Sequence, residues 1–268
     1  MGRIHVAAIE LSGLGGTVDE RASRARTAID AVPAPSARGA PELLVLPEAY
    51  FPGYAHVRAF GEGAAKEFAT SIDRRVVVGF IEGSTCCTGL WEPGGGWTTY
   101  QKRFVTPRES KVWRSGTESV VVPTAIGRVG MLICADLLHV AAWEALRGRV
   151  DIVTVSAAWP EYRGRVPPLG LGWLYAESNE YRDDVLGRAA RYLGVPIAFA
   201  NASGPGFSGG SAVWSAQGER LDAAATVHIG AAPGRVIAAT LRHPPRWSAF
   251  TRVYRWAAAG QERLASRR

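Results

Sequence analysis

The chain has 268 residues, of which 47% are hydrophobic and 21% charged, a composition typical of an ordinary globular protein rather than a disordered or fibrous one. Its formal net charge of +7 comes from 31 Lys and Arg against 24 Asp and Glu. The basic residues are scattered except in the tail, and no RNP, helix-turn-helix or zinc-finger pattern occurs, so we expect no nucleic-acid partner. We interpret the basic tail as a solvated helix or a subunit contact.

The N-terminal segment and the cysteines together predict a cytoplasmic protein. MGRIHVAAIELSGLGG lacks the long apolar region and small-residue cleavage site of a secretory signal. No window approaches the roughly 20 apolar residues that a membrane helix needs, so we expect no membrane partner. The three cysteines are odd in number and have no framework spacing, which indicates a reducing compartment.

Strand-like and helix-like patterns alternate along the chain. In the first half we predict a strand over residues 4–9, a helix over 18–31, a strand over 43–46, a helix over 64–71, a strand over 75–82 and a hairpin-like region through 94–96 into 97–104. In the second half we predict strands over 119–122 and 129–134, a helix near 139–147, a strand over 152–156, a long helix within 171–193 and strands over 195–200, 212–214, 224–229 and 236–240.

This order of elements predicts a single α/β domain over residues 1–268, with the residues after about 245 forming a C-terminal tail in subunit contacts. The Pro and Gly clusters at 33–39, 164–172 and 204–210 are short and fall between predicted elements, where turns belong. The strand-helix pairs are too few for a closed barrel of eight repeats. A layered sandwich, with helices covering the sheets, fits the pattern better.

Three chemically capable side chains stand at the ends of separate apolar runs. Glu48 closes ELLVLPE, Lys102 closes WTTYQK, and Cys134 lies near the close of VGMLICAD. Taken singly, each has an ordinary interpretation: a turn or capping acid, an edge-strand lysine with its ammonium in water, and a cysteine packed as a small hydrophobe. Taken together, they form an acid/base, a cation and a thiol that could meet at one edge of a sheet.

Those residue types suffice to break a carbon-nitrogen bond. Glu48 would take the thiol proton, and Cys134 would attack a carbonyl or nitrile carbon. Lys102, with the Ala135 backbone N–H, would stabilise the negative charge that develops. Ammonia or an amine would leave, and water activated by the same carboxylate would release the acyl group from the thioester.

Three segments, LPEAYFPGY, YQKRFVTPRES and GRVGMLICADLL, resemble the signature segments of the nitrilase superfamily of carbon-nitrogen hydrolases, in that family's order and at its usual separations. NASGPGFSGGSAVWSAQGE resembles the family's late Gly-rich strand pair, so the likeness covers nearly the whole chain. The resemblance implies that Glu48, Lys102 and Cys134 are catalytic and that Glu109 supports the lysine. It also implies a four-layer αββα sandwich, assembled as homodimers or larger homo-oligomers, that needs no metal or organic cofactor.

The segment after Cys134 departs from the pattern of the family. Ala135 stands where an aromatic residue is common, and Leu138 to Ala141 lack the usual Arg and Pro-Glu. The carboxylate-binding arginine of carbamoyl-amino-acid hydrolases is therefore missing, although Arg163 or Arg165 could bind an anion from elsewhere. The Trp-Glu pair of true nitrilases is also absent, so an amidase-like branch acting on a small amide is expected.

Two aromatic residues are candidate walls of a substrate pocket, together with the Ala135 backbone. Tyr54 follows the glutamate segment, and Trp159 follows the strand at 152–156 on the sheet edge inferred for Cys134. Either aromatic could equally belong to the core.

Other patterns in the sequence give weaker functional signals. A G-x-S-x-G motif surrounds Ser208, but a predicted strand follows it, where the nucleophile elbow of a serine hydrolase requires a helix; the residues that follow it in triad order are Asp222 and His228 or His243. The five histidines show no metal-ligand spacing, so no metal site is expected. We expect Cys86 and Cys87 to pack beneath a loop. Nitrile hydrolysis, amide-forming acyl transfer and a non-catalytic binding module stay open as alternatives.

Overall fold

The computed structural model describes residues 3–12, 15–33, 42–52, 59–161, 178–221, 224–229 and 232–242. The strands are β1 (Arg3–Ser12), β2 (Leu43–Val45), β3 (Ala59–Phe60), β4 (Arg75–Gly83), β5 (Thr85–Glu92), β6 (Gly96–Gln101), β7 (Val121–Thr124), β8 (Gly127–Ile133), β9 (Ile152–Ala157), β10 (Ile197–Ser203), β11 (Ala212–Trp214), β12 (Arg220–Leu221), β13 (Ala224–Ile229) and β14 (Ala232–Arg242). The helices are α1 (Val18–Asp30), α2 (Glu62–Thr70), α3 (Val140–Glu144) and α5 (Ser178–Leu193), with short 3₁₀ helices η1 (Glu109–Lys111) and η2 (Cys134–Leu138).

The strands form two sheets that share β1. In the first sheet, β6, β5, β4, β2 and β1 lie side by side, β14 and β13 continue beyond β1, and β3 pairs with β4. In the second, the order is β7, β8, β9, β10, β11 and β12. The last residues of β1 pair in parallel with β10, through Leu11 with Ala202 and Ser12 with Ser203. The two sheets are therefore covalently and hydrogen-bond continuous at one corner.

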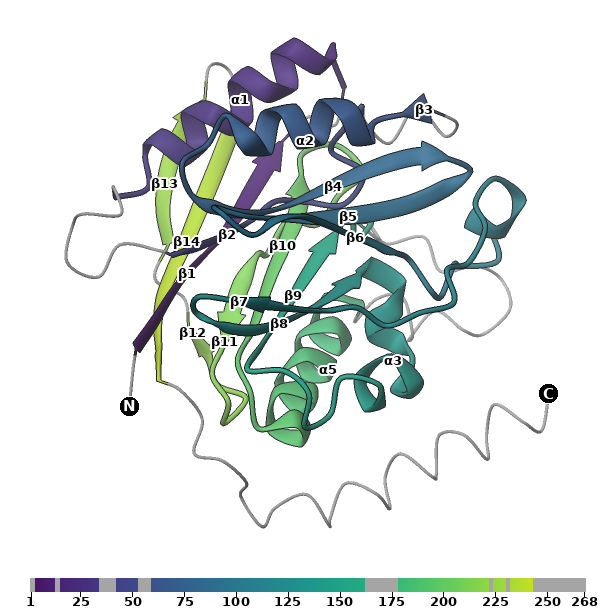
Figure 1. Cartoon of the computed structure of the whole chain (residues 1–268), viewed down its shortest axis with the longest axis vertical. Helices are drawn as coiled ribbons and strands as arrows, with labels where there is room; N and C mark the ends of the chain where they lie inside the picture. The colour runs from purple at the N-terminus through teal and green to yellow at the C-terminus, as the bar shows by residue number, and fades with distance from the viewer. Residues whose placement is uncertain are drawn as a thin grey trace.

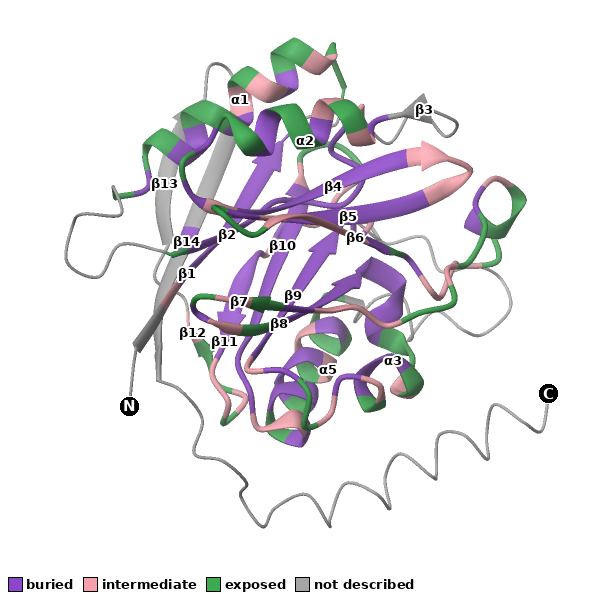
Figure 2. Cartoon of the chain, in the orientation of Figure 1, coloured by how far each residue is buried: buried purple, intermediate pink, exposed green. Residues whose placement is uncertain are grey.

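Helices cover the outer face of each sheet, which gives the four-layer αββα arrangement expected from the family resemblance. Helices α1 and α2 lie over the first sheet, and α3 and α5 lie over the second (Figure 1). In β4, Val76 and Val78 pack under α1 and α2, whereas Val77 and Ile81 point to the second sheet. This alternation follows from the two-residue period of a strand. Figure 2 shows the result, with buried strands between helices whose outer faces are exposed.

The first helix is anchored to the loop that carries Glu48. Thr17 begins α1 with a capping box, because its hydroxyl accepts from the Glu20 N–H at 3.2 Å and the Glu20 carboxylate accepts from the Thr17 N–H at 2.7 Å. Arg21, one turn further on, is buried and donates to the Tyr50 carbonyl at 3.2 Å, while the Tyr50 hydroxyl donates to the Arg21 carbonyl at 3.1 Å. These bonds fix the chain two residues after Glu48.

Most predicted elements are present, with changed ends. Strand β1 runs to Ser12 because its last residues pair with β10, and the strand predicted to include Cys134 ends at Ile133. The helix predicted near 139–147 is the shorter α3, and the strand predicted over 119–122 is shifted to β7, where it forms a tight hairpin with β8. Strand β5 and the short strands β3 and β12 were not predicted. Residues 171–177 and the tail after 245 lie outside the described residues, and the single-domain assignment stays a prediction. No helix in the described ranges is long and apolar enough to cross a membrane.

Candidate active site

Glu48, Lys102 and Glu109 meet in a buried cluster. Glu48 lies in the turn after β2, Lys102 directly follows β6, and Glu109 opens η1. The Lys102 ammonium donates to Glu48 Oε1 at 2.8 Å and to Glu109 Oε1 at 2.7 Å. Glu48 and Lys102 are both 0% exposed. The interpretation of Lys102 as an edge lysine with its head in water is therefore wrong.

The Glu48 turn is held against both sheets. Its backbone N–H donates to the Ala157 carbonyl at 3.3 Å, and its Oε2 accepts from the Ala158 N–H at 3.0 Å. On the other side, the turn lies directly on Gly79 of β4, where a Cβ atom would stand 2.3 Å from the Pro47 carbonyl and 2.8 Å from Glu48 Cα. A glycine is required at this close approach, since any side chain would displace the turn.

Cys134 lies at the same place, in a conformation that favours glycine. Its φ of 42° turns the chain sharply from β8 into η2. The Ala158 N–H that donates to Glu48 Oε2 also lies close enough to Cys134 to lower the pKa of its thiol. One backbone N–H thus lies near both the carboxylate and the thiol.

Electrostatics keep the resting thiol neutral and the lysine charged. Burial raises the pKa of Cys134 well above its ordinary value, and the negative charge of Glu48 raises it further, against the opposing effect of Lys102. Burial alone would lower the pKa of Lys102, but the charges of Glu48 and its neighbours raise it well above the ordinary value. The site therefore combines an S–H group, a carboxylate and an ammonium ion, and burial of these groups excludes most water.

Two hydrogen bonds with Thr106 hold Glu109 in place. Its second carboxylate oxygen accepts from the Thr106 N–H at 2.8 Å, and its own N–H donates to the Thr106 hydroxyl at 3.2 Å. The Trp113 ring lies 5.7 Å from the Lys102 ammonium, close enough for a cation–π contact. Glu109 and Lys102 thus form a direct ion pair, and the catalytic role of Glu109 stays a prediction.

Asp136 is a buried acid that the sequence argument did not single out. Its carboxylate accepts from the Tyr100 hydroxyl at 2.7 Å and from the backbone N–H of Phe104 at 2.8 Å. It also accepts from the backbone N–H of Ile133 at 2.9 Å and of Arg103 at 3.1 Å. The donors come from the residues around Lys102 and from the residue before Cys134, so Asp136 joins the two strand ends. The signal was the same as for Glu48, an acid immediately after a buried apolar strand.

The prediction that Cys86 and Cys87 pack beneath a loop is wrong, because both lie within a strand of the first sheet. Both belong to β5, and because strand side chains alternate they face opposite sides. Cys86 points between the two sheets, where its sulfur donates to Glu48 Oε1 at 3.4 Å. Cys87 points toward α1 and α2, and its sulfur lies 3.4 Å from the Thr85 hydroxyl.

Of the predicted pocket walls, Trp159 and Ala135 lie beside the cluster and Tyr54 falls outside the described residues. Trp159 follows Ala158, is 7% exposed, and donates its backbone N–H to Asn201 Oδ1 at 2.7 Å. Its indole N–H is buried and has no acceptor among the described residues. Ala135 is buried as the second residue of η2, where a backbone N–H has no acceptor within the helix. Arg163 and Arg165 also fall outside the described residues.

The serine-hydrolase alternative fails on its local structure. Ser208 is followed by strand β11 rather than by a helix. Its hydroxyl accepts from Arg182 at 3.0 Å and from the Asn201 amide at 3.2 Å, a network that supports the Trp159 backbone. In the described part of the chain, no group of three or more His, Cys, Asp or Glu side chains is placed to hold a metal ion.

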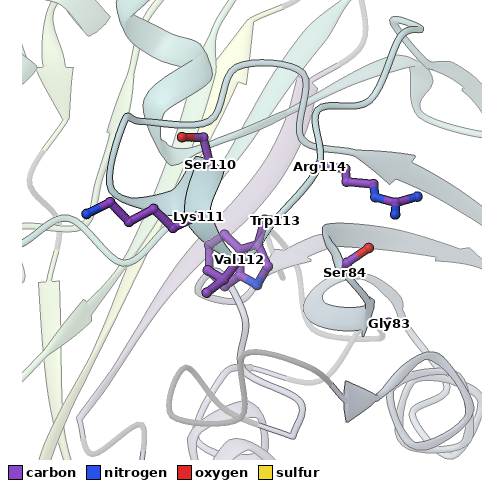
Figure 3. A pocket seen from close by; sticks show the side chains of 7 residues that line it. All are labelled: Gly83, Ser84, Ser110, Lys111, Val112, Trp113 and Arg114. Atoms are coloured by element: carbon purple, nitrogen blue, oxygen red, sulfur yellow. The ribbon is translucent and has the colours of Figure 1, made fainter.

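A surface hollow of about 520 Å³ is lined in part by Trp113. Figure 3 shows Lys111 and Arg114 extending to opposite sides of the Trp113 ring, with Ser84 near Arg114. The lining residues are Gly83, Ser84, Ser110, Lys111, Val112, Trp113 and Arg114. Glu48, Lys102 and Cys134 do not line it, so this hollow is separate from the buried cluster.

Solved structures with the same fold come from several bacteria. XC1258 of Xanthomonas campestris, a CN-hydrolase superfamily protein, superposes with a TM-score of 0.70 at 15% identity, covering 90% of this chain and 91% of that one. An amidase of the nitrilase superfamily from Nesterenkonia AN1 gives 0.65 at 19% identity, covering 88% and 90%. A carbon-nitrogen hydrolase of Helicobacter pylori G27 gives 0.67 at 15% identity, covering 88% of each.

No curated protein sequence matches the chain significantly. The family model described as carbon-nitrogen hydrolase matches residues 5–230, which is most of the chain. The protein therefore belongs to the carbon-nitrogen hydrolases of the nitrilase superfamily.

Proposed function

We propose that this protein hydrolyses the carbon-nitrogen bond of a small non-peptide amide through a thioester on Cys134. The observation that carries the proposal is the meeting of Glu48 and Lys102 at 2.8 Å, with the Ala158 N–H bonded to Glu48 and lying near the Cys134 thiol. A base, a cation and a nucleophile within one buried cluster are the groups that acyl transfer from an amide requires.

The steps follow from the charges of the resting site. Glu48 Oε2 takes the thiol proton as sulfur attacks the amide carbon, and Lys102, with the Ala135 N–H, stabilises the resulting oxyanion. Glu48 then gives its proton to the departing nitrogen, and ammonia or an amine leaves. Water replaces it, loses a proton to Glu48 and attacks the thioester. The carboxylic acid leaves, and Cys134 regains its proton.

Two observations support a polar amide as substrate. The buried Trp159 indole N–H lacks an acceptor among the described residues and follows directly after Ala158, so it is available to a substrate oxygen or nitrogen. In the related fold, a mutant of the Nesterenkonia amidase at 18% identity carries the Michael adduct of acrylamide, an unsaturated amide, at its active-site cysteine. Amide hydrolysis is therefore the reaction to test first, with nitrile hydrolysis and acyl transfer as its alternatives.

Release of ammonia from a panel of small amides, carbamoyl compounds and nitriles tests the proposal. We expect the native chain to prefer one of the amides, and Cys134→Ala to lower the rate at least about a thousand-fold because the nucleophile is gone. Glu48→Gln should cost about a hundred- to ten-thousand-fold, since it removes the proton acceptor.

Cys87→Ala is the matched control, because Cys87 faces the other side of the sheet and should leave the rate unchanged. Equal activity in Cys134→Ala and the native chain would contradict the mechanism. A preference for nitriles, or product formation only when an amine is added, would replace the proposed reaction with one of its alternatives.

A further inference from the structure

The Cys86 side chain contacts the Glu48 carboxylate, and its backbone contacts the backbone of Lys102. Its sulfur lies 3.4 Å from Glu48 Oε1, and its carbonyl accepts from the Lys102 backbone N–H at 2.8 Å. Cys86 is 0% exposed and belongs to the strand next to β6 in the first sheet, on the face turned to the second sheet. A single residue of β5 thereby contacts the carboxylate and anchors the start of the lysine.

The contact has a defined direction, because the thiol stays protonated. Burial raises the pKa of Cys86 well above its ordinary value, and the charge of Glu48 raises it further, against the effect of Lys102. A neutral thiol beside a carboxylate can only be the donor. The bond therefore runs from the Cys86 S–H to Glu48 Oε1.

The two oxygens of Glu48 have different partners. Oε1 accepts from the Lys102 ammonium at 2.8 Å and from Cys86, whereas Oε2 accepts from the Ala158 N–H at 3.0 Å, an N–H that also lies near the Cys134 thiol. The last torsion of a glutamate is soft, so the carboxylate plane would otherwise rotate over a wide range. Two donors on Oε1 and one on Oε2 fix the plane and leave Oε2 as the oxygen with fewer donors.

We propose that Cys86 is a positioning residue that holds the Glu48 carboxylate so that Oε2 receives the proton of Cys134. The inference rests on the proposed function, in which Glu48 is the base. The ionisable groups around Glu48 are Lys102 after β6, Glu109 in η1 reaching it through Lys102, Cys86 in β5 and Cys134 in η2. Of these, Cys86 and Glu109 have no step in the proposed reaction, and Glu109 bonds to Lys102, whereas Cys86 bonds to Glu48 itself.

Loss of the S–H donor removes a hydrogen bond that stabilises the charged carboxylate. In Cys86→Ala, the acid limb of the pH profile of kcat/KM should therefore move to higher pH by about 0.5 to 1 unit, as expected for one hydrogen bond to an ion. The value of kcat should fall by about three- to tenfold, because the carboxylate is less well oriented. Cys86→Ser keeps a donor and should restore the position of the limb to within about 0.3 unit.

The adjacent thiol supplies the control. Cys87→Ala removes a buried thiol of the same strand that faces α1 and α2, so it should leave the pH profile unchanged even if stability falls. If Cys86→Ala does not fold, Cys86→Val, which is close in size and has no donor, takes its place, with folding verified by circular dichroism.

A second readout requires no substrate. Iodoacetamide alkylates Cys134 when a sulfur–carbon bond forms, iodide leaves and the thiol proton passes to Glu48; the rate is followed by mass spectrometry of the peptide that contains Cys134. When the alkylation rate of Cys134 is plotted against pH, the acid limb should again lie about 0.5 to 1 unit higher in Cys86→Ala than in the native chain. If no compound of the panel releases ammonia, the proposed function fails, while this readout still tests Cys86. Superimposed profiles for native and Cys86→Ala, or an equal shift in Cys87→Ala, would overturn the inference.

Discussion

Asp136 shows how much of the candidate site depends on a residue that carries no obvious chemistry. Its carboxylate receives hydrogen bonds from the chain around Lys102 and from Ile133, immediately before Cys134. Burial raises the pKa of Asp136 to about 6, against the hydrogen bonds of Tyr100 and the backbone, which lower it. The folded chain therefore binds a proton on this carboxyl at a higher pH than the unfolded chain does.

The sign of the resulting pH dependence follows from linkage. Because the pKa of Asp136 is raised on folding, its contribution to stability is full below about pH 4 and is lost as the pH rises through about 6. The free energy of unfolding of the native chain, minus that of Asp136→Asn, should fall by about 2 kcal/mol between pH 4 and pH 7. Urea titrations across this range measure the difference, and parallel curves would contradict it. At pH 8 the variant should also lose about tenfold in activity, since an amide N–H meets backbone donors there.

At this scale, part of the site could be predicted from the sequence and part could not. Glu48, Lys102 and Cys134 each end an apolar run, and strand ends of a layered sheet converge, so their meeting was predictable. The contacts of Cys86 and Ala158 with Glu48 depend on how two separately formed sheets are placed over each other. Ala158 is 110 residues from Glu48 in the chain, and no local pattern records that register.

At the scale of elements, the order of strands and helices followed from apolar periodicity, but β5 was not predicted, because it lies between the strand predicted over 75–82 and the hairpin-like region that begins at 94. In TCCTGLWE both faces of the strand are buried, so polar and apolar residues do not alternate. Cys134 was placed at a strand end although it opens η2, because the left-handed turn at a non-glycine residue has no sequence signal. Strands of two residues, such as β3 and β12, are too short to show a period.

The packing of β4 against the Glu48 turn leads to a prediction about two glycines. Gly79→Ala would place a methyl group 2.3 Å from the Pro47 carbonyl, so it should cost about 2 kcal/mol or more in stability and abolish most of the activity by displacing Glu48. Gly63→Ala, in α2, meets nothing within 4 Å and should stabilise the chain by about 0.5 kcal/mol with unchanged activity. Thermal unfolding and ammonia release measure both. Equal behaviour of the two variants would show that the turn can move away from β4 without loss.

At the scale of the whole molecule, β1 belongs to both sheets, which bears on how the chain unfolds. It pairs with β2 and β14 in the first sheet and with β10 in the second. Residues of both sheets belong to one shared hydrophobic core between the sheets, so we expect the two sheets to unfold together. Transitions followed by far-ultraviolet circular dichroism and by tryptophan fluorescence should coincide. Leu11→Ala, at the junction of β1 with β10, should lower the free energy of unfolding by about 2 to 5 kcal/mol, and by the same amount with either probe. Two separated transitions would contradict a single domain.

The shared placement of the reacting groups has one further consequence. Glu48 and Lys102 extend from one sheet and Cys134 and Ala158 from the other, so the distance between acid and nucleophile is set by how the layers interlock. A slip of about an ångström between the layers would slow catalysis severely while leaving each sheet intact. Substitutions of apolar side chains between the layers, such as Val77 and Met131, should therefore change turnover as well as stability. Natural variation at such interior positions should be read as variation in rate.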